Sequence, residues 1–92
     1  MLQIHKYGLT PMAPYGTSEM VSLPDCAEIL SLQLQRGVPV IWARVDIDKP
    51  KRRRLVYVYH TGSNCDGSLH MDYLGSIQYE EGTYILHYFI TR

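Results

Sequence analysis

The stretch that decides the fold is AEILSLQLQ at residues 27–35, followed by the pair Arg36–Gly37 and then VPVIWARVD at residues 38–46. In the first run, apolar residues alternate with polar ones, so Leu30 and Leu32 are expected to share one face. A period of two is typical of half-buried strands, and a glycine between two such runs is typical of a hairpin turn. We therefore predict two antiparallel strands joined at Arg36–Gly37.

The rest of the chain also reads as strands separated by turns. We predict further strands over residues 2–7, 20–23, 55–61, 73–79 and 83–91, with loops over 8–18 and 62–72 and a polar connection over 46–53. The strand at 55–61 is apolar on both faces and is therefore expected to be central in its sheet. The sequence predicts an all-β fold of about seven strands, either a small antiparallel sandwich or a partly open barrel, forming one domain over residues 1–92.

Composition restricts the class of protein. Nine basic and nine acidic residues cancel, which excludes a strong overall charge that would attract nucleic acid or an anionic membrane. No apolar run approaches the roughly 20 residues of a membrane helix, and the start lacks the pattern of an export signal. The two cysteines, Cys26 and Cys65, form no recognisable disulfide framework. We expect a cytoplasmic protein with reduced thiols and no membrane partner.

Tyrosine is unusually common, with eight residues against one Phe and one Trp. Its ring packs against apolar groups while its hydroxyl forms hydrogen bonds, which suits recognition surfaces, although tyrosine also favours half-buried strand positions. Tyr57 and Tyr59 are our candidates for binding a partner or ligand. Trp42 shares the period-two register of Val38 and Val40, so we predict that it anchors the core.

Five positive charges fall within six residues, which are Lys49, Lys51, Arg52, Arg53 and Arg54. One interpretation is a contact with phosphate, RNA or an acidic protein partner. The other is a solvated loop that also protects an edge strand against aggregation. The sequence leaves both interpretations open.

The segment HTGSNCDGSLH begins where the strand at 55–61 ends. His60, Cys65 and His70 are possible zinc ligands, but their spacing matches no standard finger. Cys65 with a histidine base is a second option, without resemblance to a known nucleophile signature. Sequence alone does not say whether these three side chains meet in the fold.

The same segment offers Thr61, Gly62 and Ser63 as a candidate anion site. Backbone N–H groups and hydroxyls in such a turn are able to cradle a phosphate. The alternative is a polar turn whose Asn, Asp and Ser residues satisfy their own backbone.

Signs of catalysis are absent from the motifs. There is no glycine-rich phosphate loop, no paired-histidine metal helix and no GxSxG. His87 lies in register with Ile85 and Phe89, and we predict a hydrogen-bonded histidine in the core rather than a catalytic base. We expect a protein that is not an enzyme and needs no cofactor.

Several short motifs are spread along nearly the whole chain. They are K-Y at 6–7, L-P-x-x-A-x-I-L at 23–30, Q-x-G-x-P at 35–39, W-A-x-V-D at 42–46, T-G at 61–62 and G-x-x-x-x-H at 82–87. Together they resemble a small family of uncharacterised phage-encoded proteins of about this length. The resemblance implies a phage origin and a single β domain, and it assigns no reaction.

Three functions follow as hypotheses. By analogy with small phage accessory proteins, the first is an inhibitor that binds a bacterial defence protein or ribonucleoprotein complex, such as a CRISPR effector, through tyrosine-rich strand faces and the basic rim at 49–54. The second is a sponge for a nucleotide signal, using residues 61–64 for phosphate, 52–54 for charge and Trp42 or a tyrosine for base stacking. The third is a structural or regulatory phage component. The oligomeric state, including a homodimer, stays open.

Overall fold

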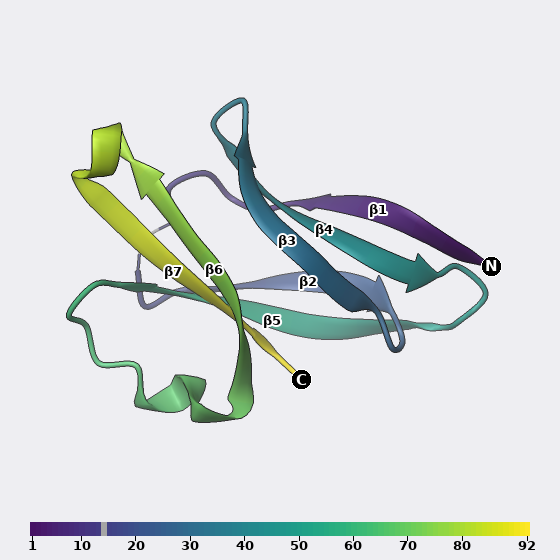
Figure 1. Cartoon of the computed structure of the whole chain (residues 1–92). Coiled ribbons are helices and arrows are strands. Elements are labelled where there is room, and N and C mark those ends of the chain that lie inside the picture. Colours follow the sequence, from purple (N-terminus) through teal and green to yellow (C-terminus); the bar gives the residue numbers. More distant parts are fainter. Residues whose placement is uncertain (14) are drawn as a thin grey trace.

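Two antiparallel sheets pack face to face in the computed structural model, which describes residues 1–13 and 15–92 (Figure 1). The strands are β1 (Leu2–Gly8), β2 (Ser18–Pro24), β3 (Glu28–Gln35), β4 (Val38–Asp46), β5 (Lys51–His60), β6 (Met71–Tyr79) and β7 (Tyr84–Thr91), with 3-10 turns η1 (Asp66–His70) and η2 (Glu80–Gly82). One sheet has the order β1-β4-β3 and the other β2-β5-β7-β6. The predicted all-β sandwich is confirmed, and it is open rather than a closed barrel. Within the described residues, no helix is long and apolar enough to cross a membrane.

The central hairpin forms as its sequence predicts. Gln35 pairs with Val38, which leaves Arg36 and Gly37 as a two-residue turn between β3 and β4. Both turn residues have positive φ, 51° and 81°, as a type I′ turn requires. Glycine adopts this conformation without a steric penalty, and the twist of such a turn matches that of the two strands.

The predicted loop over residues 8–18 also forms up to the start of β2 at Ser18, except that position 14 lies outside the described residues.

The core lies between the two sheets and is built from alternate strand positions. Its most deeply buried side chains are Leu23, Ile41, Ala43, Val45, Val56, Leu86, Tyr88 and Ile90. Burying one large apolar side chain stabilises the fold by about 1.5–3 kcal/mol. The Tyr79 and Tyr88 hydroxyls, both buried, lie 3.2 Å apart and share a hydrogen bond. Burial, followed by this hydrogen bond, raises the pKa of Tyr88 above its usual value.

Strand β5 is central, as predicted, but it begins earlier than predicted. It lies between β2 and β7, and its pairing with β2 extends back to Lys51 opposite Pro24. The polar connection predicted over residues 46–53 is therefore wrong in its second half, because β2 supplies backbone partners whatever the charge of the side chains. Alternation along the extra residues then directs Arg54 inward, where only 9% of its surface is exposed, and Lys51 and Arg53 outward.

The prediction that Trp42 anchors the core is wrong. The side chains of β4 that enter the core are Ile41, Ala43 and Val45, so Trp42 faces outward. The ammonium of Lys6 lies 5.8 Å from the centre of its ring. Both faces of β4 are apolar, and for that reason the alternation pattern did not distinguish the inner face from the outer one.

Two bulges lie in the edge strands at which the sheets approach each other. Between Ile29 and Ser31 the register of β3 skips Leu30, which is 44% exposed, while Ile29 and Leu32 pack against the core. The expectation that Leu30 and Leu32 share a face is therefore wrong. Strand β6 has a matching irregularity at Leu74. Bulges are common at sheet edges, and β3 and β6 are the edges where the two sheets approach each other.

Candidate functional site

The outward side of the four-stranded sheet carries a continuous group of ring side chains. The ladder places Tyr57 of β5 opposite Phe89 of β7, Tyr59 opposite His87, and Tyr73 of β6 opposite Phe89. These five residues are called the outer aromatic face here. The ring of Phe89 lies 5.6 Å from Tyr59 in an edge-to-face contact and 5.0 Å from Tyr73. Such contacts stabilise the cluster, yet 57% of Tyr73 remains exposed.

His87 organises the middle of this face. Its Nε2 lies 2.8 Å from the Thr61 hydroxyl, and its Nδ1 lies 3.5 Å from the Tyr73 hydroxyl. The predicted register with Ile85 and Phe89 is confirmed, and the ring is hydrogen-bonded, but its predicted place in the core is wrong. The neighbouring positions on β7 enter the core instead, so His87 is half-buried on the outer side.

The segment between β5 and β6 extends away from the sheet before the chain returns as β6 (Figure 1). Residues of this segment and of the outer aromatic face line an open pocket of about 370 Å³. We call this cavity the loop pocket. Its wall includes Thr61, Gly62 and Ser63, which therefore lie beside Tyr59. The backbone N–H and the hydroxyl of Ser63 both donate to the His60 carbonyl, at 3.1 and 2.8 Å. Two of the donors proposed for an anion are thus used within the turn itself.

His60, Cys65 and His70 were the candidate zinc ligands. Among residues 1–13 and 15–92, no three His, Cys, Asp or Glu side chains are grouped so that they would hold a metal ion. The Nδ1 of His60 instead donates to the Thr61 carbonyl at 2.6 Å, and its ring packs edge-on against Tyr15 at 4.1 Å. Cys65 is an exposed free thiol.

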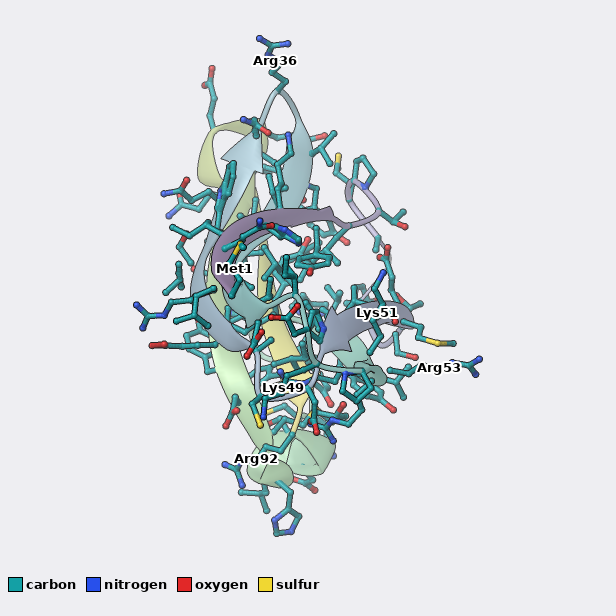
Figure 2. The ribbon with its side chains drawn as sticks, turned by 90° about the vertical axis from the view of Figure 1, so that its right-hand side faces the viewer. Met1, Arg36, Lys49, Lys51, Arg53 and Arg92 are labelled. Atoms are coloured by element: carbon teal, nitrogen blue, oxygen red, sulfur yellow. The ribbon has the colours of Figure 1, made fainter. Side chains whose placement is uncertain are left out.

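The five predicted basic residues separate into four groups. Figure 2 shows Lys51 and Arg53 extending on one side of the molecule, and alternation puts them on the same face of β5 as the two tyrosines. Lys49 lies in the exposed β4–β5 turn. Arg52 is engaged by the Asp25 carboxylate at 3.6 Å and by the Arg92 carbonyl. Arg54 points into the protein.

The structure therefore brings together part of the predicted site and separates the rest. Arg53 and Tyr59 are six residues apart along β5, a span of about 20 Å. The basic residues thus lie at one end of the strand and the loop pocket at the other. Trp42 lies on the outward side of the other sheet. Of the side chains considered for a nucleotide site, a tyrosine therefore lies beside the loop, whereas Trp42 and the arginines do not.

The comparison with protein families gives one match. The model of a domain of unknown function, DUF7352, matches residues 1–92. The chain belongs to the DUF7352 family. No curated protein and no solved structure matches the chain. Membership of an uncharacterised small-domain family is thereby shown, while the motifs that suggested it and the phage origin stay predictions.

Three residues of the site in this DUF7352 chain were not assigned from sequence. Tyr73, His87 and Phe89 line the loop pocket together with the predicted residues. The usable signal was the period-two register of residues 85, 87 and 89. Pairing that strand with the tyrosine-rich one would have placed all these side chains on one outward face.

Proposed function

We propose that this chain is a non-enzymatic phage accessory protein that works in the host cytoplasm and inhibits a bacterial defence system by binding a protein effector complex, in the manner of an anti-CRISPR inhibitor. The observation that carries this proposal is the outer aromatic face, an uncovered group of rings on a rigid sheet with unpaired cations at one end. The phage origin and the defence target rest on the resemblance of the motifs.

The aromatic side chains supply the expected binding energy. Tyrosine and other large rings are enriched among the few residues that dominate protein interfaces, because they bury much surface and lose little conformational freedom. Tyr57, Tyr59 and Phe89 are half-buried and held by neighbouring strands, so ordering them on binding costs little.

The cations supply orientation and steering. Within the described part of the chain, Lys51 and Arg53 form no ion pair and no side-chain hydrogen bond, although both are exposed beside the aromatic rings. Since the chain has no net charge, these groups act as a local patch that favours an acidic protein surface.

The test is capture of a partner from a lysate of defence-bearing bacteria, using the tagged chain and two matched variants. Arg53→Glu reverses a charge beside the outer aromatic face, and Arg36→Glu makes the same change at the distant β3–β4 turn. We expect a near-stoichiometric protein complex with wild type and Arg36→Glu, and a loss of about tenfold or more with Arg53→Glu. Equal capture by all three proteins, or no protein complex, would contradict the proposal.

A nucleotide-binding function is the second candidate. It is favoured by the loop pocket, whose volume of about 370 Å³ lies in the range of small-molecule sites and whose walls offer rings for base stacking. Purified wild type is heated, and the released small molecules are identified by mass spectrometry, with Phe89→Ala as the comparison. Release of a stoichiometric nucleotide from wild type alone would favour the sponge over the inhibitor.

A further inference from the structure

We propose that Arg54 and the cavity around it form a binding site for a compact oxyanion, a single phosphate or carboxylate group. The cavity lies where the edge strands β3 and β6 approach each other and has a volume of about 480 Å³. We call it the seam pocket. It is separate from the loop pocket and does not depend on the function proposed above.

Arg54 is a buried cation without a carboxylate partner. Its Nε donates to the Thr91 carbonyl at 2.8 Å, and in the described residues no acidic side chain lies within ion-pair distance of its guanidinium. Every fully buried side-chain nitrogen or oxygen of the described residues has a hydrogen-bond partner, so the outer nitrogens of this guanidinium reach solvent through the open seam pocket. The two outer nitrogens of the guanidinium have no hydrogen-bond partner in the described chain, and they form the planar fork that binds a carboxylate or phosphate at two points.

The acidic groups around the seam pocket are already neutralised by other arginines. Glu28 of β3 is bound by Arg44, and Asp72 of β6 is bound by Arg92 at 2.9 Å. Arg54 is the one cation among the described residues that line the seam pocket, and the nearby charge of Asp72 favours its protonated form. Arg52 adds positive charge nearby and is the second cause, after burial, that lowers the pKa of Arg54.

The backbone of the seam adds donors. Strands β3 and β6 are sheet edges, and no backbone hydrogen bond joins one to the other among the described residues. An edge strand leaves every second N–H unpaired, and a bulge leaves one more. Both bulged residues, Leu30 and Leu74, line the seam pocket. The Arg54 guanidinium and the two bulged edge strands thus line one pocket, which suits an oxyanion.

The test is a titration of the whole chain followed by NMR, with sodium phosphate and sodium acetate added separately at constant ionic strength. We expect saturable shifts of the Leu30 and Leu74 amides and of the Arg54 Nε–H signal with at least one of the two anions. Saturation by phosphate alone identifies a phosphate site, and saturation by acetate alone identifies a carboxylate site.

Two variants separate this site from general attraction to positive charge. Arg54→Gln is expected to weaken anion binding by at least about tenfold, whereas Arg53→Gln, its exposed neighbour, leaves it unchanged. If Arg54→Gln does not fold, the Arg54 Nε–H signal of wild type still decides. The proposal is overturned if neither anion gives saturable shifts in the seam pocket, or if Arg54→Gln binds as tightly as Arg53→Gln.

Discussion

The outward faces of the two sheets differ in whether their aromatic and charged side chains already have partners within the protein. On the three-stranded sheet, Lys6 lies over the Trp42 ring and donates to the Gln35 side chain at 3.0 Å, and Arg44 is bound to Glu28. Aromatic and charged groups on that face thus satisfy one another.

On the four-stranded sheet, the outward aromatic and charged side chains are not paired with one another in this way. The rings of Tyr59 and Tyr73 pack against Phe89, and the outward cations of this sheet, Lys51 and Arg53, form no ion pair within the part of the chain that the structure describes. The comparison teaches that an aromatic residue on a sheet surface indicates a binding face only where neighbouring side chains of the same protein do not already pair with its ring. For this reason we place the binding surface on the second sheet and not around Trp42.

The largest expected effect separates the two sides of β7. Leu86 is fully buried, and Leu86→Ala should lower the free energy of unfolding by about 2–5 kcal/mol. Its neighbour Ile85 faces outward and is half-buried, so Ile85→Ala should cost only about 1 kcal/mol. Urea denaturation of both variants measures the difference. Equal losses would mean that the inner and outer faces of the strand have been assigned incorrectly.

The next effect concerns binding rather than folding. Tyr59→Ala removes a ring from the outer aromatic face and should weaken partner binding by about 30-fold, the loss of a hot spot worth about 2 kcal/mol. Trp42→Ala removes a larger ring from the opposite side of the sandwich and should leave affinity within about twofold. Calorimetry with the captured partner gives both values, after thermal melts have shown that both variants fold. A greater loss for Trp42→Ala would reverse the comparison.

Alkaline pH distinguishes buried from outward tyrosines. The raised pKa of Tyr88 means that its contribution to stability is complete below about pH 10, where the unfolded chain also keeps the proton. Above that pH the unfolded state ionises first, and stability should fall by up to about 1.4 kcal/mol per pH unit. Tyr88→Phe should reduce this dependence in denaturation curves measured between pH 8 and 11 (about the accessible range). A slope unchanged in Tyr88→Phe would contradict this account.

The smallest effect tests whether the outward face of the three-stranded sheet takes no part in partner binding. Lys6→Ala removes the cation over Trp42 and should cost about 0.5 kcal/mol of stability, because the pair is exposed to solvent. Partner binding should not change. Chemical denaturation and the capture assay check the two parts, and a loss of binding would show that the three-stranded sheet also contacts the partner.

Sequence periodicity predicted the strands well because alternation and turn chemistry are local properties. The hairpin at Arg36–Gly37 formed, the strands predicted over 73–79 and 83–91 are present as β6 and β7, and β5 is central. The inner face of β4 was not predictable in this way, since Trp42 and Ile41 begin two equally apolar faces. That choice depends on which strands pair across the sandwich, and those pairings join residues far apart in the chain.

The candidate site was predicted only in part for the same reason. Tyr59 and Thr61 were identified because they are neighbours in the sequence. Phe89 and Tyr73 lie far from them in the chain, and only strand pairing places them at the site. Arg54 was grouped with its exposed neighbours because charge usually indicates exposure. The period-two pattern places Arg54 on the same face of the strand as Val56 and Val58. Because those valines are buried, the pattern indicated that Arg54 is buried as well.

The most direct test of the binding face is photo-crosslinking from two positions. A photoreactive phenylalanine analogue replaces Tyr57 on the four-stranded sheet or, as the control, the exposed Ile4 on the outward side of β1. After irradiation in lysate of defence-bearing bacteria, we predict one protein adduct from position 57 and none from position 4. An adduct from position 4 alone would contradict the assignment of the binding surface to the outer aromatic face.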